Sequence, residues 1–294
     1  MNDKFDYNEI KSAVKSESAK SFNKTSLYFK ELIKNNIDEF IDIIPITNFI
    51  SERIFTVIHL LEVDKVWDAE IILRTVLESF MKALYILTQR NPKDYAERLD
   101  EYWGVLDEIE RINQSEKAKE FLKNDRILNI ETIKGLILSE EEEKEIKNIP
   151  SWSNRKYRVA LKNSWSYSGI LLYLMKDEKT PPLISFELLQ FYYKISSHIA
   201  HGDKTGINLV RRFPKPSHDR VKLQDITQYI KIVKIINDIT SWLSLELAIH
   251  TANQEAINKI MDEYRKYSKY IVGVHIPLMQ ELNRLTTEEM DAEV

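Results

Sequence analysis

The scarcity of turn-forming residues limits the fold of this chain more than any other feature. It contains 6 Gly and 8 Pro in 294 residues, whereas average usage would supply roughly 20 Gly and 15 Pro. Sandwiches, barrels and doubly wound sheets need many turns and are therefore disfavoured. Hydrophobic residues make up 43% of the chain, enough to build a core. The composition predicts an all-α fold, an elongated multi-helix bundle.

The spacing of apolar residues locates the first helices. Between Ser26 and Ile44 apolar residues recur every three or four positions, which is the period of an amphipathic helix. Pro45 ends this helix or opens the next one. The same period continues over 46–63 and 66–89, and the second of these segments is apolar on most sides. A helix of that kind is typical of the middle of a bundle.

Start and stop signals define a later helix. Ser185 is a good N-cap, and Gly202 is a natural end, so we expect a helix over 186–201. A loop of about twenty residues should follow, and a loop of that length suggests function or disorder. We expect further helices over 221–253 and 254–270, and a frayed acidic end.

Composition shifts suggest three parts. They are an N-terminal helical extension over 1–45, a central helical bundle over 46–253 and a C-terminal helical segment with an acidic tail over 254–294. The acidic run Glu140–Glu145 is typical of a solvated helix or a mobile connector.

The overall charge and the absent residue types exclude several kinds of protein. The chain has no Cys and a net charge of -4, so thiolate chemistry is excluded and no global field attracts nucleic acid or membrane. The amino terminus is too polar for a signal peptide, and no apolar run approaches the ~18 residues that span a bilayer. We expect a cytoplasmic protein without membrane contact, metal or cofactor.

Arg74 and Glu78 form the first candidate site. They lie four residues apart and so share a face of a helix that is otherwise largely apolar. Because a buried ion needs a partner, the pair is either an internal salt bridge or the lining of a polar cavity. In the second case Arg74 would bind a phosphate or another anion.

The end of the predicted helix 186–201 forms the second candidate site. Ser197 and His201 share a face, with Tyr193 on the preceding turn and His198 turned away by about a hundred degrees. A histidine in the last helical turn suits general acid or base chemistry. Alternatively, it caps the last carbonyl groups.

Two other chemistries are weaker alternatives at this end. His198, His201 and Asp203 could hold a metal ion, but no Glu-x-x-His or His-Glu-x-x-His pattern completes such a site. Ser197 lies inside a helix rather than in a nucleophile turn, which disfavours it as a covalent nucleophile.

The third candidate is a local excess of positive charge. Residues 204–222 hold six basic side chains against Asp219 alone, an excess of five charges. Together with the basic and aromatic segment 152–173, this pattern suggests a surface that follows phosphates and stacks bases, or simply a solvated face beside core aromatics. The basic residues are Lys204, Arg211, Arg212, Lys215, Arg220 and Lys222.

The Arg-x-x-x-Glu helix and the later Ser-x-x-x-His-Gly helix end resemble a bacterial helical family without an assigned function. More distantly, residues 46–210 are similar to the HEPN helical proteins of toxin and phage-defence systems. That resemblance implies a HEPN-like core, a dimer and metal-independent RNase activity. HEPN nucleases carry an Arg four to six residues before a His on one helix.

The sequence departs from this HEPN motif. No Arg precedes His198 or His201 within seven residues. Arg212 and His218 have the formal spacing, but Pro214 and Pro216 lie between them and make a regular helix improbable. Arg74 would therefore have to supply the cation from another helix.

We expect an RNA-directed, metal-independent endoribonuclease or toxin-like effector of a bacterial defence system. In it, His201 removes a proton from a ribose 2'-hydroxyl and Arg74 stabilises the phosphate. The alternative is a non-catalytic helical binding or sensor module. Expected partners are RNA, a second copy or a defence protein. The candidate catalytic residues are Arg74, Glu78, Ser197 and His201, and the candidate substrate-binding residues are Tyr193, His198, Lys204, Arg211, Arg212 and Lys215.

Overall fold

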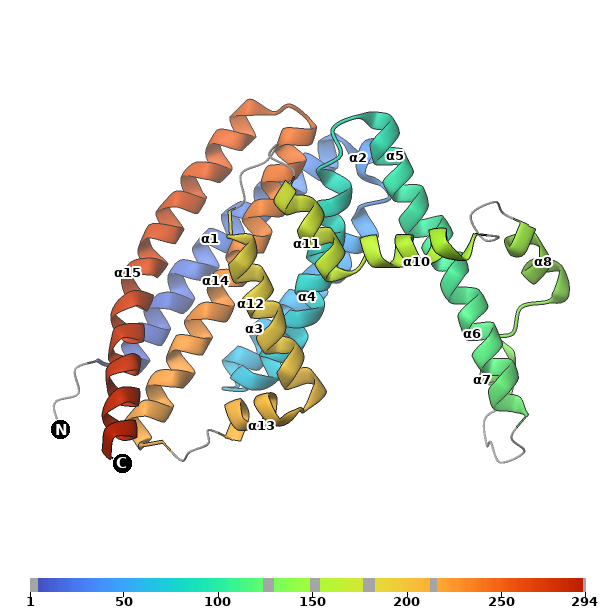
Figure 1. Cartoon of the computed structure of the whole chain (residues 1–294). Helices are drawn as coiled ribbons and strands as arrows, with labels where there is room; N and C mark the ends of the chain where they lie inside the picture. The colour runs from blue at the N-terminus through green and yellow to red at the C-terminus, as the bar shows by residue number, and fades with distance from the viewer. Residues whose placement is uncertain (1–4, 124–129, 149–153, 177–182, 212–215, 293–294) are drawn as a thin grey trace. The chain divides into compact units, whose positions relative to one another are not determined.

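A computed structural model describes residues 5–123, 130–148, 154–176, 183–211 and 216–292 (Figure 1). Within these residues the regular structure is helical and no strand occurs, which confirms the all-α prediction. The chain divides into two compact units, residues 1–88 with 178–294, and residues 89–177. These boundaries differ from the expected breaks at 45/46 and 253/254, which stay a prediction.

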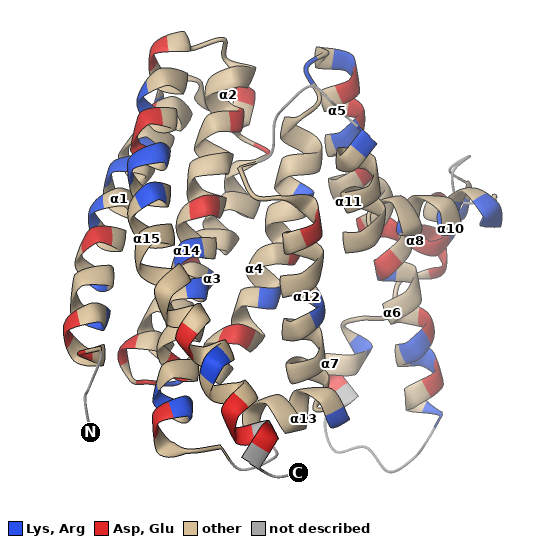
Figure 2. Cartoon of the chain, turned by 60° about the vertical axis from the view of Figure 1, so that its left-hand side comes forward, with Lys and Arg blue, Asp and Glu red and all other residues tan. Residues whose placement is uncertain are grey.

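The larger unit consists of long helices from both ends of the chain. The central helix, α14, packs against α1, α4 and α15, and it buries residues on nearly all of its sides between Leu223 and Ala248. Charged residues of both signs are spread along the long helices (Figure 2). The helices are α1 (Tyr7–Asn35), α2 (Ile37–Phe40), α3 (Ile44–Glu62), α4 (Val66–Leu87), α12 (Phe186–His201), α13 (Lys204–Arg211), α14 (His218–His250) and α15 (Gln254–Ala292).

The helix signals of the sequence work where they were predicted. Pro45 lies in the first turn of α3 and so opens that helix. The Ser185 hydroxyl accepts a hydrogen bond from the Leu188 N–H at 3.2 Å, as an N-cap does. Gly202 ends α12 in the left-handed conformation at φ 59°, which favours glycine. The predicted bounds 186–201 are confirmed.

Helix α1 begins at Tyr7, almost twenty residues before the predicted start. Its buried face carries Ser18, Ser21 and Thr25 in place of apolar residues, so the apolar period is not visible there. Ser18 shares a hydrogen bond with the Tyr267 hydroxyl at 3.0 Å. Small hydroxyl residues thus make a helix interface that hydrophobic periodicity does not reveal.

The expectation of a frayed acidic end was wrong over 286–292, because α15 continues to Ala292. Ile271 and Leu278 are buried and hold the second half of this helix against the bundle. Near the end of α15, Glu289 forms an ion pair with Arg220 of α14 at 2.8 Å. The acidic residues are therefore partly neutralised by a neighbouring helix.

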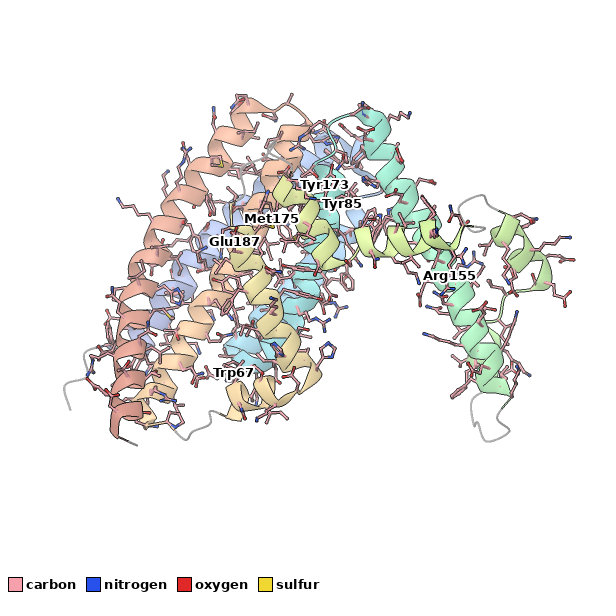
Figure 3. The ribbon with its side chains drawn as sticks, in the orientation of Figure 1. Trp67, Tyr85, Arg155, Tyr173, Met175 and Glu187 are labelled. Atoms are coloured by element: carbon pink, nitrogen blue, oxygen red, sulfur yellow. The ribbon has the colours of Figure 1, made fainter. Side chains whose placement is uncertain are left out.

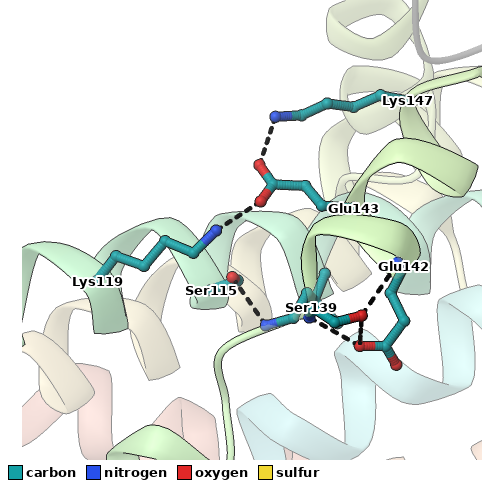
Figure 4. A network of polar contacts seen from close by, with 7 residues as sticks. Ser115, Lys119, Ser139, Glu142, Glu143 and Lys147 are labelled. Carbon is teal, nitrogen blue, oxygen red and sulfur yellow. Dashed lines mark hydrogen bonds and ion pairs between the residues drawn. The ribbon is translucent and has the colours of Figure 1, made fainter.

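The smaller unit contains shorter helices. The acidic run forms a helix, α8, in which Glu143 is held by Lys119 at 2.5 Å and by Lys147 (Figure 4). These lysines lower the pKa of Glu143 to about 2. The helices are α5 (Pro92–Asp100), a π-helical turn η1 (Glu101–Val105), α6 (Leu106–Leu122), α7 (Ile130–Lys134), α8 (Glu140–Asn148), α10 (Arg155–Ser164) and α11 (Tyr167–Lys176).

Two aromatic residues of segment 152–173 belong to the core of the smaller unit. Trp165 and Tyr167 are buried, and the Trp165 indole N–H donates to the Glu101 carboxylate at 2.9 Å. The interpretation that these two rings stack bases was therefore wrong. Trp152 lies outside the described residues.

Candidate functional site

A buried carboxylate joins three helices of the larger unit. The Glu70 side chain of α4 is 0% exposed. It accepts hydrogen bonds from the Ser196 hydroxyl of α12 at 2.7 Å and from the Gln228 amide of α14 at 2.6 Å. The Lys231 ammonium completes the set at 3.1 Å, and burial lowers the pKa of Lys231. Every oxygen of Glu70 is thus engaged, which is the condition for keeping a charge inside a protein.

Arg74, Glu78 and Tyr193 lie together one to two turns further along α4. The Tyr193 hydroxyl donates to Glu78 at 2.8 Å, and the Arg74 guanidinium lies 3.2 Å from the same carboxylate oxygen. Arg74 also reaches the Tyr193 hydroxyl at 3.4 Å, with its guanidinium carbon 5.4 Å from the ring centre. The structure therefore brings together these three candidate residues, which we call the Arg74 cluster.

The Arg74 cluster is only partly exposed to solvent. Arg74 is 25% exposed and Glu78 36% exposed. The hydrogen bond with Tyr193 raises the pKa of Arg74, while burial raises the pKa of Tyr193. The Arg74 Nε is buried without a hydrogen-bond partner among the described residues. The charge of Arg74 is balanced within the cluster by the Glu78 carboxylate.

His201 does not join this cluster. Helices α4 and α12 run antiparallel. Glu70 contacts Ser196, while Glu78, which lies later in α4, contacts Tyr193, which lies earlier in α12. His201 lies eight residues beyond Tyr193, about 12 Å along the helix axis. At that end Ile199 and Gly202 line a shallow groove with Trp67, which lies at the start of α4 (Figure 3). The expected site is therefore split. Arg74 of α4 contacts α12 at Tyr193, whereas His201 lies about two turns further along α12.

The expected loop after Gly202 contains a short helix, α13, so that part of the loop prediction was wrong. Asp203 caps this helix by accepting a hydrogen bond from the Gly206 N–H at 3.0 Å. A Cβ at Gly206 would lie 2.1 Å from the His198 carbonyl oxygen, so only glycine fits there. The cap and the glycine together fold α13 back against the end of α12.

The corner between α12 and α13 presents an oriented imidazole. The His198 Nδ1 donates to the Asp203 carboxylate at 2.6 Å, and the two side chains are 43% and 45% exposed. This bond lowers the pKa of Asp203. Because Nδ1 is engaged, the other ring nitrogen of His198 is the one available for proton transfer. The same geometry is also typical of an exposed helix-corner contact.

His198 has three polar neighbours along the chain that face solvent. Lys194 lies one turn before it, His201 one turn after it and Lys204 at the start of α13, and all three are exposed. We call Lys194, His198, His201 and Lys204 the histidine surface. Ser197, beside it on α12, is half-buried.

The described part of the predicted basic segment 204–222 has fewer exposed, unpaired basic side chains than its sequence suggests. Arg212 and Lys215 lie outside the described residues, and only the backbone of Arg211 is described. Arg220 is paired with Glu289 of α15. In the described part of this segment, Lys204 and Lys222 remain as exposed cations.

Sequence reasoning missed Glu70 and the partner role of Asp203. Glu70, Gln228 and Lys231 are polar residues within largely apolar helices, which was the available signal for a buried network. Asp203 had been considered only as a metal ligand. Among the described residues, no group of three or more His, Asp or Glu side chains is placed to hold a metal ion. Nor does any described helix have the length and apolar character needed to span a bilayer.

Comparison with known protein families identifies the family of this chain. A family model covers residues 50–219, more than half of the chain. The chain belongs to DUF5677, a family of unknown function. The matched range holds both the Arg74 cluster and the histidine surface, whereas α1, α15 and nearly all of α14 lie outside it. No curated protein and no solved structure matches the chain.

Proposed function

We propose that the protein is a metal-independent endoribonuclease whose reaction takes place at the histidine surface. The single observation that supports it most is the imidazole of His198, oriented by Asp203 at 2.6 Å and open to solvent. A carboxylate that engages one ring nitrogen selects the tautomer in which the other nitrogen accepts a proton. A toxin-like role in bacterial defence, expected from the HEPN resemblance, belongs to the same proposal.

His198 is the general base in this mechanism. Its Nε2 removes the proton of a ribose 2'-hydroxyl, and the Asp203 carboxylate stabilises the resulting imidazolium. This assignment differs from the expectation from the sequence, in which His201 was the base. The reason is that Asp203 provides His198 with an orienting partner, and no comparable contact to His201 occurs among the described residues.

His201 is the general acid. Residues three apart on a helix have Cβ atoms about 5–6 Å apart, so two imidazoles can flank one phosphate. As the 2'-oxygen bonds to phosphorus, the bond from phosphorus to the 5'-oxygen breaks, and protonated His201 gives its proton to that leaving oxygen. Lys194 and Lys204 offset the charge on the other phosphate oxygens. The products are a 2',3'-cyclic phosphate and a 5'-hydroxyl.

Cleavage of a defined RNA by the full chain in the presence of EDTA tests this proposal. We expect cyclic phosphate ends, and no cleavage where a single 2'-deoxyribose replaces the ribose at the cut site. His198→Ala and His201→Ala should each slow cleavage by about 10²–10⁴-fold. Asp203→Asn should slow cleavage while leaving the unfolding transition close to that of the unmodified chain.

His59→Ala is the matched control, because His59 also lies exposed in the last turn of a helix, α3. It should cleave RNA at the unmodified rate. Intact RNA, or equal rates for the three histidine variants, would remove the proposal.

A non-catalytic binding or sensor module is the second candidate. The Arg74 cluster favours it, since the charge of Arg74 is already balanced by Glu78 and its guanidinium contacts the Tyr193 hydroxyl. In that case the cluster holds α4 to α12, and the histidine surface serves as a contact for an anionic partner. RNA that binds the chain but is never cut would support this candidate over the first.

A further inference from the structure

A cavity of about 250 Å³ lies among α1, α3 and α14 of the larger unit, at a place that none of the nuclease residues reach. These three helices belong to one compact unit (Figure 1). Most of the cavity wall is apolar, and the side chains that form it include Phe22, Ile58, Leu61, Val233 and Ile236. A concave and largely apolar pocket with a few polar groups is typical of a site that binds a small molecule.

One polar group in the wall lacks a partner. Asn237 of α14 lines the cavity and is only 3% exposed. Its amide nitrogen donates to the Val233 carbonyl at 3.1 Å. Its Oδ1 is buried and accepts no hydrogen bond from the described residues. A buried acceptor without a donor costs free energy, so this oxygen favours a molecule that brings an N–H or O–H.

The rim of the cavity offers an aromatic contact and a neutral entrance. Phe55 is 62% exposed, and its ring packs edge-on against Phe22 with the ring centres 6.5 Å apart. Lys15 and Glu62 form an ion pair across the rim at 2.9 Å and so cancel each other. A charged occupant would lose its hydration without gaining an unpaired counter-charge among the described lining residues.

We propose that this cavity binds a small, uncharged aromatic molecule that carries one hydrogen-bond donor. Its rings contact Phe22 and Phe55, and its N–H or O–H donates to the Asn237 Oδ1. This oxygen is covered by its neighbours, so it meets the donor when the amide turns about its last torsion and exchanges the bond from its nitrogen to the Val233 carbonyl for the bond to the occupant. That torsion is soft in asparagine. The proposal is independent of nuclease activity.

Calorimetric titration of the full chain with indole and with benzofuran tests the inference. The two probes have nearly the same shape, but benzofuran has an oxygen in place of the indole N–H. Because one neutral hydrogen bond separates them, we expect indole to bind about three to ten times more tightly. In Asn237→Leu this preference should disappear.

Phe55→Ala provides a variant that leaves the interior of the bundle intact, and it should weaken the binding of both probes. Phe121→Ala is its matched control, because Phe121 is also an exposed phenylalanine on a helix but does not line the cavity. Failure of indole to bind up to its solubility limit overturns the proposal. Equal affinities for indole and benzofuran in the unmodified chain overturn it as well.

Discussion

The inner and outer faces of α12 carry polar residues in opposite environments. On the inner face, Ser196 is fully buried and donates to Glu70, which is equally buried and bound by further side chains from α14. On the outer face, His198 and Asp203 form their contact while almost half exposed. The inner contact specifies how three helices pack. The outer contact leaves the His198 imidazole partly exposed to solvent, as the proposed reaction requires.

The Arg74 cluster lies between these extremes. The Tyr193 hydroxyl contacts both Arg74 and Glu78, so the cluster resembles the inner face in having several polar partners. Its exposure is closer to that of the outer face. Polar groups with several partners, such as Glu70, hold helices together, whereas His198 has one side-chain partner among the described residues and is the group to which we assign chemistry.

The largest effect is expected from breaking the inner contact. Glu70→Ala leaves the Lys231 ammonium, 12% exposed, without its carboxylate. We expect the free energy of unfolding to fall by about 3 to 5 kcal/mol, measured by urea denaturation. The double variant Glu70→Met with Lys231→Met removes both charges and should restore most of the loss. A loss below about 1 kcal/mol for Glu70→Ala would show that this network does not hold the helices together.

A second effect concerns the pH dependence of stability. Asp238 of α14 is buried beside Lys234, with Tyr192, Tyr264 and Tyr267 facing it from α12 and α15. Burial raises the pKa of Asp238 from 3.8 to about 6. The folded state therefore binds this proton more tightly than the unfolded state. Stability falls as the pH rises from about 4 to about 6, by about 3 kcal/mol for this group.

Urea denaturation of Asp238→Asn and of the unmodified chain at a series of pH values measures this effect. The variant should lose this part of the pH dependence, while the contributions of other groups cancel in the comparison. Identical pH profiles for the two proteins would contradict the role of Asp238. The result tests the polar groups on the buried side of α12, because Tyr192 of that helix is one of the groups near Asp238.

The smallest effect is expected in the Arg74 cluster. Tyr193→Phe removes the hydroxyl that contacts Glu78 and Arg74, and should lower the free energy of unfolding by about 0.5 to 1.5 kcal/mol. The rate of RNA cleavage should stay unchanged. Loss of cleavage with an unchanged unfolding curve would contradict the structural role of this cluster and would assign it to the proposed reaction instead.

Sequence reasoning succeeded where the signal was local. Ser185 and Gly202 determine the ends of α12 through hydrogen bonds and a backbone angle within a few residues. The Arg74–Glu78 contact also follows from helical spacing. The start of α1 was missed because Ser18, Ser21 and Thr25 occupy its buried face. Helix α13 was missed because it is short and its cap, Asp203, had been considered only as a metal ligand.

Sequence patterns alone predicted that the chain is helical and where α3, α4, α12 and α14 lie, because capping, turn propensity and apolar period act over a few residues. Only the tertiary structure decided that Tyr193 joins Arg74, that Glu70 meets Lys231, and that His201 lies about two turns of α12 from the Arg74 cluster. These relations depend on the antiparallel packing of α4 and α12, in which the bonded residues lie more than a hundred positions apart in the sequence. That packing is set by the complementarity of whole helix faces, which no short pattern in the sequence encodes.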